Sequence, residues 1–283
     1  MTLKYKTLVL EDGFRVAVAT AGDRRGLPLV FLHGLTVSAG AYVELLEGLA
    51  GVGFYVVAPD AANHGGTGSL PWGHTVADMA EVVARLCSAL DIAQAVIVGH
   101  SMGGGMAVEF AAAYPERTIA AVLLDAAAGQ EHHDNIKVGK GSTIPWRAAQ
   151  RLAAAFVDVI GDGYAAMRVR DPLERLSLLD TLRKSVSSFR FVRAAYALMR
   201  ADTVPLLEKM AINEIPTAVI HGDLDQIIPF ASGVSAAAAA DADLYVVEGG
   251  FHSWMLAEPA LAVELIITAL MGFNPQRYLL GAE

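Results

Sequence analysis

Short apolar runs without polar alternation recur along the chain, and each is followed by a turn or a helical pattern. The runs lie at 29–32, 55–58, 95–98, 119–124, 217–220 and 244–247. A strand that is apolar at every position is buried on both faces, which is typical of a parallel sheet covered by helices. Apolar positions at helical spacing predict helices at about 41–49, 75–90, 106–111 and 259–270.

Two further segments, 3–10 and 14–19, precede these runs and predict a hairpin that turns through residues 11–13. With the six apolar runs they predict an α/β fold with a mostly parallel, eight-stranded, doubly wound sheet. Thr75, followed three residues later by Asp78, is a candidate N-cap for the helix at 75–90.

Residues 130–212 interrupt this alternation of strand and helix. They are rich in Leu, Ala, Arg and Met at helical spacing and contain no convincing strand. We therefore predict a core domain formed by 1–129 and 213–283. The segment 130–212 is predicted to be a helical cap, or lid, inserted after the sixth strand over the catalytic edge of the sheet.

Composition narrows the class of protein. Of the 283 residues 54% are hydrophobic, enough for a large core, but no apolar run approaches the length of a membrane span. The first residues lead into a strand pattern instead of a signal-peptide core, so a cytoplasmic location is expected.

Cys87 is the only cysteine, which excludes an intrachain disulfide. The net charge of -9 argues against nucleic acid or an anionic membrane as partner, and the sequence does not indicate an oligomeric state.

The charge is unevenly distributed. Residues 136–200 contain 12 Lys or Arg and 5 Asp or Glu, whereas the rest of the chain is strongly acidic. The excess shrinks when the segment is widened to 130–212. Basic side chains over an apolar pocket would attract a substrate that carries a carboxylate. The alternative is that these side chains lie on outer helix faces and pair with the acidic core.

The strongest chemical signal is Gly99-x-Ser101-x-Gly103, which connects the buried strand at 95–98 to a helical segment. This is the nucleophile-elbow pattern, in which glycines allow a sharp turn with an exposed serine hydroxyl. A serine hydroxyl is a weak nucleophile and needs a base to take its proton. After an elbow serine the expected chain order is an acid and then a histidine.

Polar side chains at the ends of later strands supply this acid and base. His252 follows the run at 244–247, while Asp223 and Asp225 follow the run at 217–220, and Asp125 ends the sixth strand. The carboxyl ends of parallel strands gather at one edge of a sheet, so these groups are expected beside Ser101.

These motifs together resemble the α/β-hydrolase fold family over nearly the whole chain except the cap. The resemblance rests on His33-Gly34, the segment 60–68, the elbow, the loop with Gly222, Asp225 and Pro229, and Gly250-x-His252. It implies a Ser101, Asp225, His252 triad, with Asp223 capping the acid loop and Asp125 as the alternative acid. It also implies an oxyanion hole formed by the main-chain N–H groups of Leu35 and Met102.

Where the family often has R-G-H-G after Asp60, this chain has Ala62-Asn63-His64-Gly65. His64 and His100 are expected to support the loops beside the site. The run Glu131-His132-His133-Asp134 suggests a metal site, but adjacent side chains diverge. We interpret this run as a solvated loop and predict neither a metal nor a cofactor.

A serine at the elbow is not typical of the haloalkane dehalogenases and epoxide hydrolases of this family. Hydrolysis of carboxylic esters is the leading interpretation, with an ester and water as the only reactants. Monoesters of dicarboxylic acids, such as monoalkyl phthalates, suit the basic segment. Enol-lactone or carbon–carbon bond hydrolysis is the first alternative, and a non-catalytic receptor or scaffold is an alternative from another class. Candidate substrate contacts are His33, Gly34, His100, Trp146, Phe189 and Tyr196.

Overall fold

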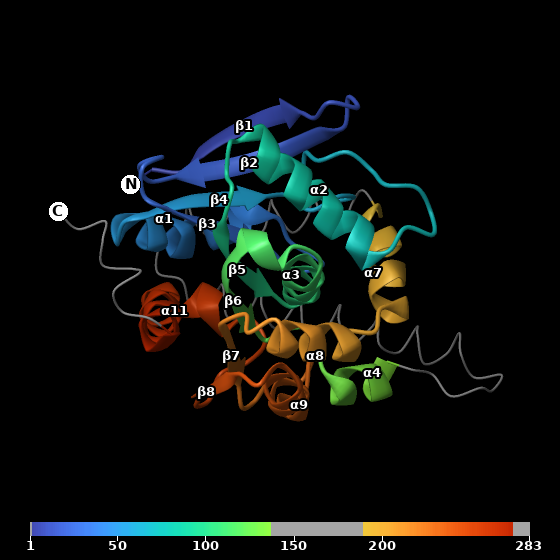
Figure 1. Ribbon diagram of the computed structural model, residues 1–283, viewed down its shortest axis with the longest axis vertical. Coiled ribbons are helices and arrows are strands. Elements are labelled where there is room, and N and C mark those ends of the chain that lie inside the picture. The colour runs from blue at the N-terminus through green and yellow to red at the C-terminus, as the bar shows by residue number, and fades with distance from the viewer. Residues whose placement is uncertain (1, 137–188, 274–283) are drawn as a thin grey trace.

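The computed structural model describes residues 2–136 and 189–273 and contains the predicted eight-stranded sheet (Figure 1). The strand order is β1-β2-β4-β3-β5-β6-β7-β8. β1 pairs antiparallel with β2 and β2 with β4, while the other neighbours are parallel. The strands are β1 Lys4–Val9, β2 Arg15–Ala21, β3 Leu27–Leu32, β4 Phe54–Pro59, β5 Ala95–His100, β6 Thr118–Leu124, β7 Thr217–Gly222 and β8 Asp243–Val247. The α/β fold class is confirmed.

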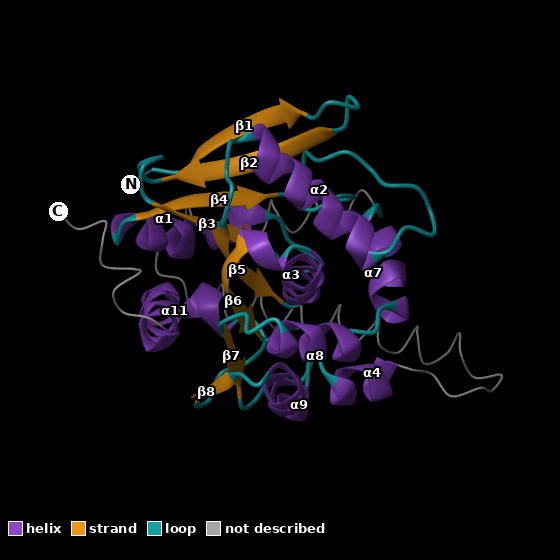
Figure 2. Cartoon of the chain, viewed as in Figure 1, coloured by secondary structure: helices purple, strands orange, loops and turns teal. Residues whose placement is uncertain are grey.

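Helices cover both faces of the sheet, as the apolar strands require (Figure 2). One face carries α2 (Val76–Ala89), α3 (Met102–Ala113), α8 (Val204–Ile212) and α9 (Phe230–Ala240). The opposite face carries α1 (Val43–Gly51) and α11 (Pro259–Phe273). Each layer is filled by its own apolar cluster, so strands β4 to β7 are buried at every position.

Local signals in the sequence correctly placed most elements. Thr75 and Asp78 form a reciprocal capping box at the start of α2, in which each side chain accepts the other residue's main-chain N–H. The helix predicted at about 41–49 is divided into a 3₁₀ turn, Ala39–Tyr42, and α1. That division places Tyr42 under the edge of the sheet where β3 and β5 end.

The described parts of the segment 130–212 are α4 (Gln130–Ile136), α7 (Phe191–Arg200) and α8. α4 packs against α9, α7 against α2, and α8 against both α3 and α9. Leu207 and Met210 of α8 are completely buried in the same apolar cluster as α3 and α9. We therefore propose that the cap ends before α8, and that 204–212 belongs to the core layer.

The expectation of a solvated loop at 131–134 is wrong. These residues lie in α4, and His132 and His133 are only 4% and 3% exposed. His133 Nε2 lies 2.8 Å from both the main-chain nitrogen and Oγ1 of Thr203, and the same Oγ1 accepts the N–H of Gly129. Hydrogen bonds with Thr203 compensate the cost of burying a histidine here. Because Thr203 is distant in the sequence, the local pattern does not reveal this partner.

Among the described residues, no helix has both the length and the apolarity to cross a membrane.

Candidate active site

Ser101 occupies a strained turn between β5 and α3. Its backbone has φ 54° and ψ −118°, a conformation that L-residues rarely adopt. The neighbouring glycines make the turn possible, because a Cβ on Gly99 would lie 2.1 Å from the Gly103 carbonyl oxygen. A Cβ on Gly103 would lie 2.0 Å from the carbonyl oxygen of Leu32. Strand and helix thus cross too closely for any side chain, and the turn presents Ser101 at the sheet edge.

His252 and Asp225 form a directly hydrogen-bonded pair. His252 Nδ1 lies 2.8 Å from Asp225 Oδ2, and an ionised carboxylate only accepts, so the Nδ1–H donates. Nε2 is then the basic nitrogen of the neutral ring. The other carboxylate oxygen accepts the main-chain N–H groups of Ile227 and Ile228. Burial opposes the negative charge, but the neighbouring His252 and the hydrogen bonds outweigh it and hold the pKa of Asp225 below its usual range.

The carboxylate of Asp125, the alternative acid, hydrogen-bonds groups other than the His252 ring. Its carboxylate accepts the indole N–H of Trp254 at 2.6 Å and the main-chain N–H of Gly222 at 2.9 Å. The residue is fully buried, and this burial raises the pKa of Asp125 to about 7 despite the nearby His221. Asp223 accepts the N–H of Gly249, so it connects the loop after β7 to the turn after β8.

Three loops that are far apart in the sequence meet around the elbow. The ring of His100 lies 4.8 Å from the ring of His252, centroid to centroid, and its Nε2 is 2.9 Å from the His252 carbonyl oxygen. On the other side, a Cβ built on Gly34 would lie 3.5 Å from the Cβ of Ser101. Ser101 is therefore flanked by the loop that carries His252 and by the loop that follows β3.

The loop after β3 carries Leu35, one of the two residues predicted to supply an oxyanion hole. Met102 is the first residue of α3, where main-chain N–H groups have no partner within the helix. Within the described part of the chain, we find no hydrogen bond from the N–H of Leu35 or Met102 to another residue. The N–H of Gly34, by contrast, donates to the Tyr42 hydroxyl. Leu35 and Met102 thus offer the two N–H groups that the sequence suggested.

Two buried histidines hold this loop. His33 Nδ1 lies 2.7 Å from the Gly34 carbonyl oxygen, and its Nε2 accepts the N–H of Ala61. His64 Nε2 lies beside the carbonyl oxygen of Leu35. Burial lowers the pKa of both rings, that of His64 to about 3, so both are neutral near pH 7. Of the predicted substrate contacts, His33, Gly34 and His100 therefore all bind neighbouring protein groups.

Three of the predicted substrate contacts, Trp146, Phe189 and Tyr196, lie in the segment predicted to be the cap. Trp146 lies outside the described residues. Phe189 is 71% exposed, and Tyr196 is 42% exposed with the Arg200 guanidinium 5.4 Å from its ring centroid. Neither side chain is among the hydrogen-bond partners of His252 and Asp225 in the described residues.

Asp125, His221 and Asp225 are the residues whose chemistry could suit a metal, since their ligand atoms lie within 4.8 Å of one another. Both carboxylates already accept N–H groups, and His221 Nε2 lies 2.9 Å from the carbonyl oxygen of Ile228. The carboxylate oxygens and His221 Nε2 are therefore already engaged, while His221 Nδ1 has no hydrogen-bond partner among the described residues. Sequence reasoning missed the roles of Tyr42, His221 and Trp254, and only His221, at a strand end, carried a local signal.

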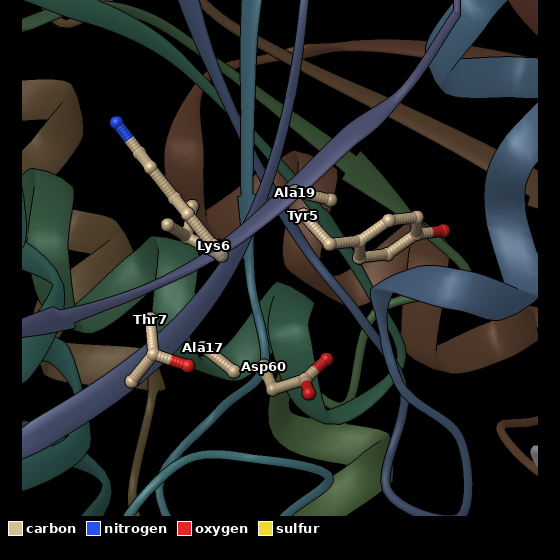
Figure 3. A pocket seen from close by; sticks show the side chains of 7 residues that line it. Tyr5, Lys6, Thr7, Ala17, Ala19 and Asp60 are labelled. Atoms are coloured by element: carbon tan, nitrogen blue, oxygen red, sulfur yellow. The ribbon is translucent and has the colours of Figure 1, made fainter.

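A separate hollow of about 370 Å³ lies over the N-terminal hairpin (Figure 3). It is lined by Tyr5, Lys6, Thr7, Ala17, Val18, Ala19 and Asp60. The Asp60 carboxylate accepts the N–H groups of Ala39 and Gly66, so it ties two loops together. Ser101, His252 and Asp225 are not among the residues that line this hollow.

Comparison with known proteins agrees with the observed fold. The family model described as alpha/beta hydrolase fold matches residues 28–259. A protein of Mycobacterium phage D29 named "Putative non-heme haloperoxidase" is 59% identical over 99% of this chain and 100% of its own length. The "Bifunctional esterase/perhydrolase DCH" of Acinetobacter calcoaceticus is 26% identical over 93% of this chain and 97% of its own. The structure of an esterase from Exiguobacterium antarcticum superposes with a TM-score of 0.74 at 21% identity, covering 93% of this chain and 98% of that one.

Proposed function

Because the chain belongs to the alpha/beta hydrolase fold family, we propose that it is a serine hydrolase that cleaves carboxylic esters, with Ser101, His252 and Asp225 as its catalytic residues. The observation that carries the proposal is the hydrogen bond between His252 and Asp225 beside a strained serine at the end of β5. A serine, a base and a buried acid at one sheet edge are the parts that acyl transfer requires.

The reaction follows from the roles of these groups. Ser101 Oγ attacks the ester carbonyl while Nε2 of His252 takes its proton. The oxyanion that forms is stabilised by the N–H groups of Leu35 and Met102, which are fixed before the charge appears. Collapse expels the alcohol, which receives the proton from His252. Water then attacks the acyl-enzyme by the same sequence and releases the acid and Ser101.

Turnover of p-nitrophenyl butyrate by the Ser101→Ala variant tests this proposal. We expect the kcat of this variant to fall by roughly 10⁴-fold or more, because the covalent route is lost. Ser88→Ala is the matched control, since its hydroxyl only donates within α2, and it should retain wild-type activity. Unchanged activity in Ser101→Ala would reject the nucleophile. A protein without any ester turnover would instead fit the receptor or scaffold alternative.

The basic segment extends the proposal to esters that carry a carboxylate, such as monoalkyl phthalates. Arg190 and Arg193 are engaged by main-chain carbonyls of residues 65–70, so recognition of a carboxylate would fall to basic residues of 137–188. Hydrolysis rates for a phthalate monoester and its matching diester decide the point. Faster hydrolysis of the diester would contradict recognition of a substrate carboxylate, but it would still be consistent with an ester hydrolase. Parallel assays with an enol-lactone and a ring-cleavage product test the first alternative.

The names of the two relatives favour a second reaction of the same acyl-enzyme. Hydrogen peroxide in place of water would attack the acyl carbon, release Ser101 and yield a peroxycarboxylic acid. That acid could oxidise a halide ion to hypohalous acid and return to the carboxylic acid. The assay is halogenation of monochlorodimedone with acetate, bromide and peroxide present, and Ser101→Ala should abolish it. Halogenation that does not depend on Ser101 would contradict this route.

A further inference from the structure

Four buried groups form a continuous chain of hydrogen bonds behind Ser101. The main-chain N–H of Gly34 donates to Tyr42 Oη at 3.2 Å, and Tyr42 Oη lies 2.7 Å from His100 Nδ1. On its other side the His100 ring places Nε2 2.9 Å from the His252 carbonyl oxygen. We call this chain of Gly34, Tyr42, His100 and His252 the relay. It spans from the loop after β3 to the loop after β8.

The chemistry of each atom sets the direction of the relay. The His252 carbonyl only accepts, so the hydrogen of the His100 ring is on Nε2. Burial lowers the pKa of His100 to about 3, so the ring is neutral and Nδ1 carries a lone pair. Tyr42 must then donate its hydroxyl hydrogen to Nδ1 while its oxygen accepts the Gly34 N–H. One tautomer of His100 therefore fits the contacts, and the ring cannot flip without breaking two of them.

At its first end the relay fixes one of the two peptide planes that flank Gly34. The 33–34 plane is held through the Gly34 N–H by Tyr42, and the 34–35 plane is held through the Gly34 carbonyl by His33. In a trans peptide the C=O and N–H point in opposite directions, so the bond from His33 sets where the N–H of Leu35 points. Tyr42 anchors the preceding plane, from which the 34–35 plane extends, and so acts on this N–H only through the backbone of Gly34.

At its other end the relay fixes the main chain of the base. His252 is held at two points, at its carbonyl by His100 and at its ring by Asp225. Two anchors on one residue restrict both its backbone and its side-chain torsions. A small displacement of a general base or an oxyanion donor can reduce the rate of a reaction strongly.

From this geometry we infer that Tyr42 and His100 are positioning residues, which hold the oxyanion loop and the base loop at a fixed separation across Ser101. The inference rests on the proposed function, because it assigns these residues to the reaction of that site. Neither side chain takes part in the chemical steps.

Tyr42→Phe is the first test, because it removes one oxygen and keeps the ring. We expect kcat for p-nitrophenyl butyrate to fall about 10- to 100-fold with KM unchanged, since the lost interaction matters only in the transition state. Binding of a trifluoromethyl ketone, whose adduct on the serine carries an oxyanion, should weaken by the same factor as kcat/KM. Tyr55→Phe is the matched control, because Tyr55 is a buried tyrosine on β4 outside the relay.

Two variants of His100 divide the relay into its halves. His100→Gln keeps a donor near the Nε2 position for the His252 carbonyl but removes the acceptor for Tyr42. His100→Asn keeps an acceptor near the Nδ1 position but removes the donor to His252. In both variants the Tyr42 oxygen can still accept the Gly34 N–H. Adding Tyr42→Phe to His100→Gln should therefore cost clearly less activity than in the wild type, whereas adding it to His100→Asn should cost nearly as much as in the wild type.

The outcomes separate this inference from the proposed function. Strictly additive losses in both double variants, or a Tyr42→Phe enzyme with wild-type kcat and ketone affinity, would overturn the relay while Ser101→Ala stays inactive. If Ser101→Ala is active, the proposed function itself fails. Should Tyr42→Phe lower the melting temperature too far for assay, the two single variants still test the inference. His100→Gln and His100→Asn should each lower kcat with KM unchanged, and wild-type kcat in both would overturn the relay.

Discussion

At the scale of single residues, two buried carboxylates show how surroundings assign different properties to the same side chain. Asp225 is paired with His252 and receives two main-chain N–H groups, and its pKa is lowered. Asp125 is buried as a partner of Trp254 and Gly222, and its pKa is raised to about 7. Only the first is suited to stabilise a positively charged imidazole at pH 7.

Asp125 makes folding stability depend on pH in a direction that can be measured. The folded protein keeps a proton on Asp125 up to about pH 7, whereas the unfolded chain releases this proton at about pH 4. Between these values the folded state binds more protons, so this residue lowers the free energy of unfolding as the pH rises through that window. Asp225 has the opposite sign, and its contribution is lost as the pH falls below about 4.

We therefore expect Asp125→Asn to change the pH profile of stability, because asparagine has no proton to release. The melting temperature of this variant relative to wild type should increase from pH 4.5 to pH 7.5. The measurement is thermal unfolding followed by circular dichroism at several pH values. A difference between the two proteins that stays constant over this range would contradict the raised pKa.

At the scale of elements, the close approach of α3 to β5 and β3 depends on space that only glycine leaves. We expect Gly103→Ala to lower the free energy of unfolding by about 3 kcal/mol or more, because the new Cβ would meet the main-chain oxygen of Leu32 and backbone must shift. Gly51→Ala, at the end of α1, is the control. Its Cβ would meet nothing within 4 Å, so its stability should be unchanged or slightly higher.

Urea unfolding of the two alanine variants measures this difference. The activity of Gly103→Ala should fall together with its stability, since Gly103 lies two residues after Ser101 and the same packing holds the elbow. A Gly103→Ala protein as stable as Gly51→Ala would show that α3 can move away from β3 without cost, which contradicts the close packing at Leu32.

The elements that sequence predicted well are those whose determinants are local. The elbow, the Thr75 cap and the acid loop each occupy a few consecutive residues, and one rule about the ends of parallel strands placed His252 near Ser101. Tyr42 was not predicted, because 58 residues separate it from His100 and it reads as an ordinary apolar position. His133 was misjudged for a related reason, since its partner Thr203 is 70 residues away.

At the scale of the whole molecule, two arginines in the described part of the basic segment attach it to the core. Arg190 donates to the carbonyls of Gly65 and Thr67 and to the hydroxyl of Ser69, and Arg193 donates to the carbonyl of Leu70. Arg193 also lies 5.3 Å from the centroid of the Trp72 ring. These contacts are to main-chain carbonyls, a hydroxyl and an aromatic ring, not to the acidic side chains that the alternative interpretation expects, and they place α7 beside the loop that follows β4.

Removing one of these attachments should loosen α7 without disturbing the core. We expect Arg190→Met to increase amide hydrogen exchange in 191–200 and in 65–70, because three hydrogen bonds from a charged donor are lost while most of the side-chain volume remains. Exchange in β5 and β6 should not change, since these strands are buried on both faces. Arg200→Met is the matched control, because the Arg200 guanidinium packs on Tyr196 of its own helix and its loss should leave 65–70 unaffected. Exchange mass spectrometry measures all four segments at once, and equal exchange of 65–70 in Arg190→Met and wild type would show that α7 is held by apolar packing on α2 instead.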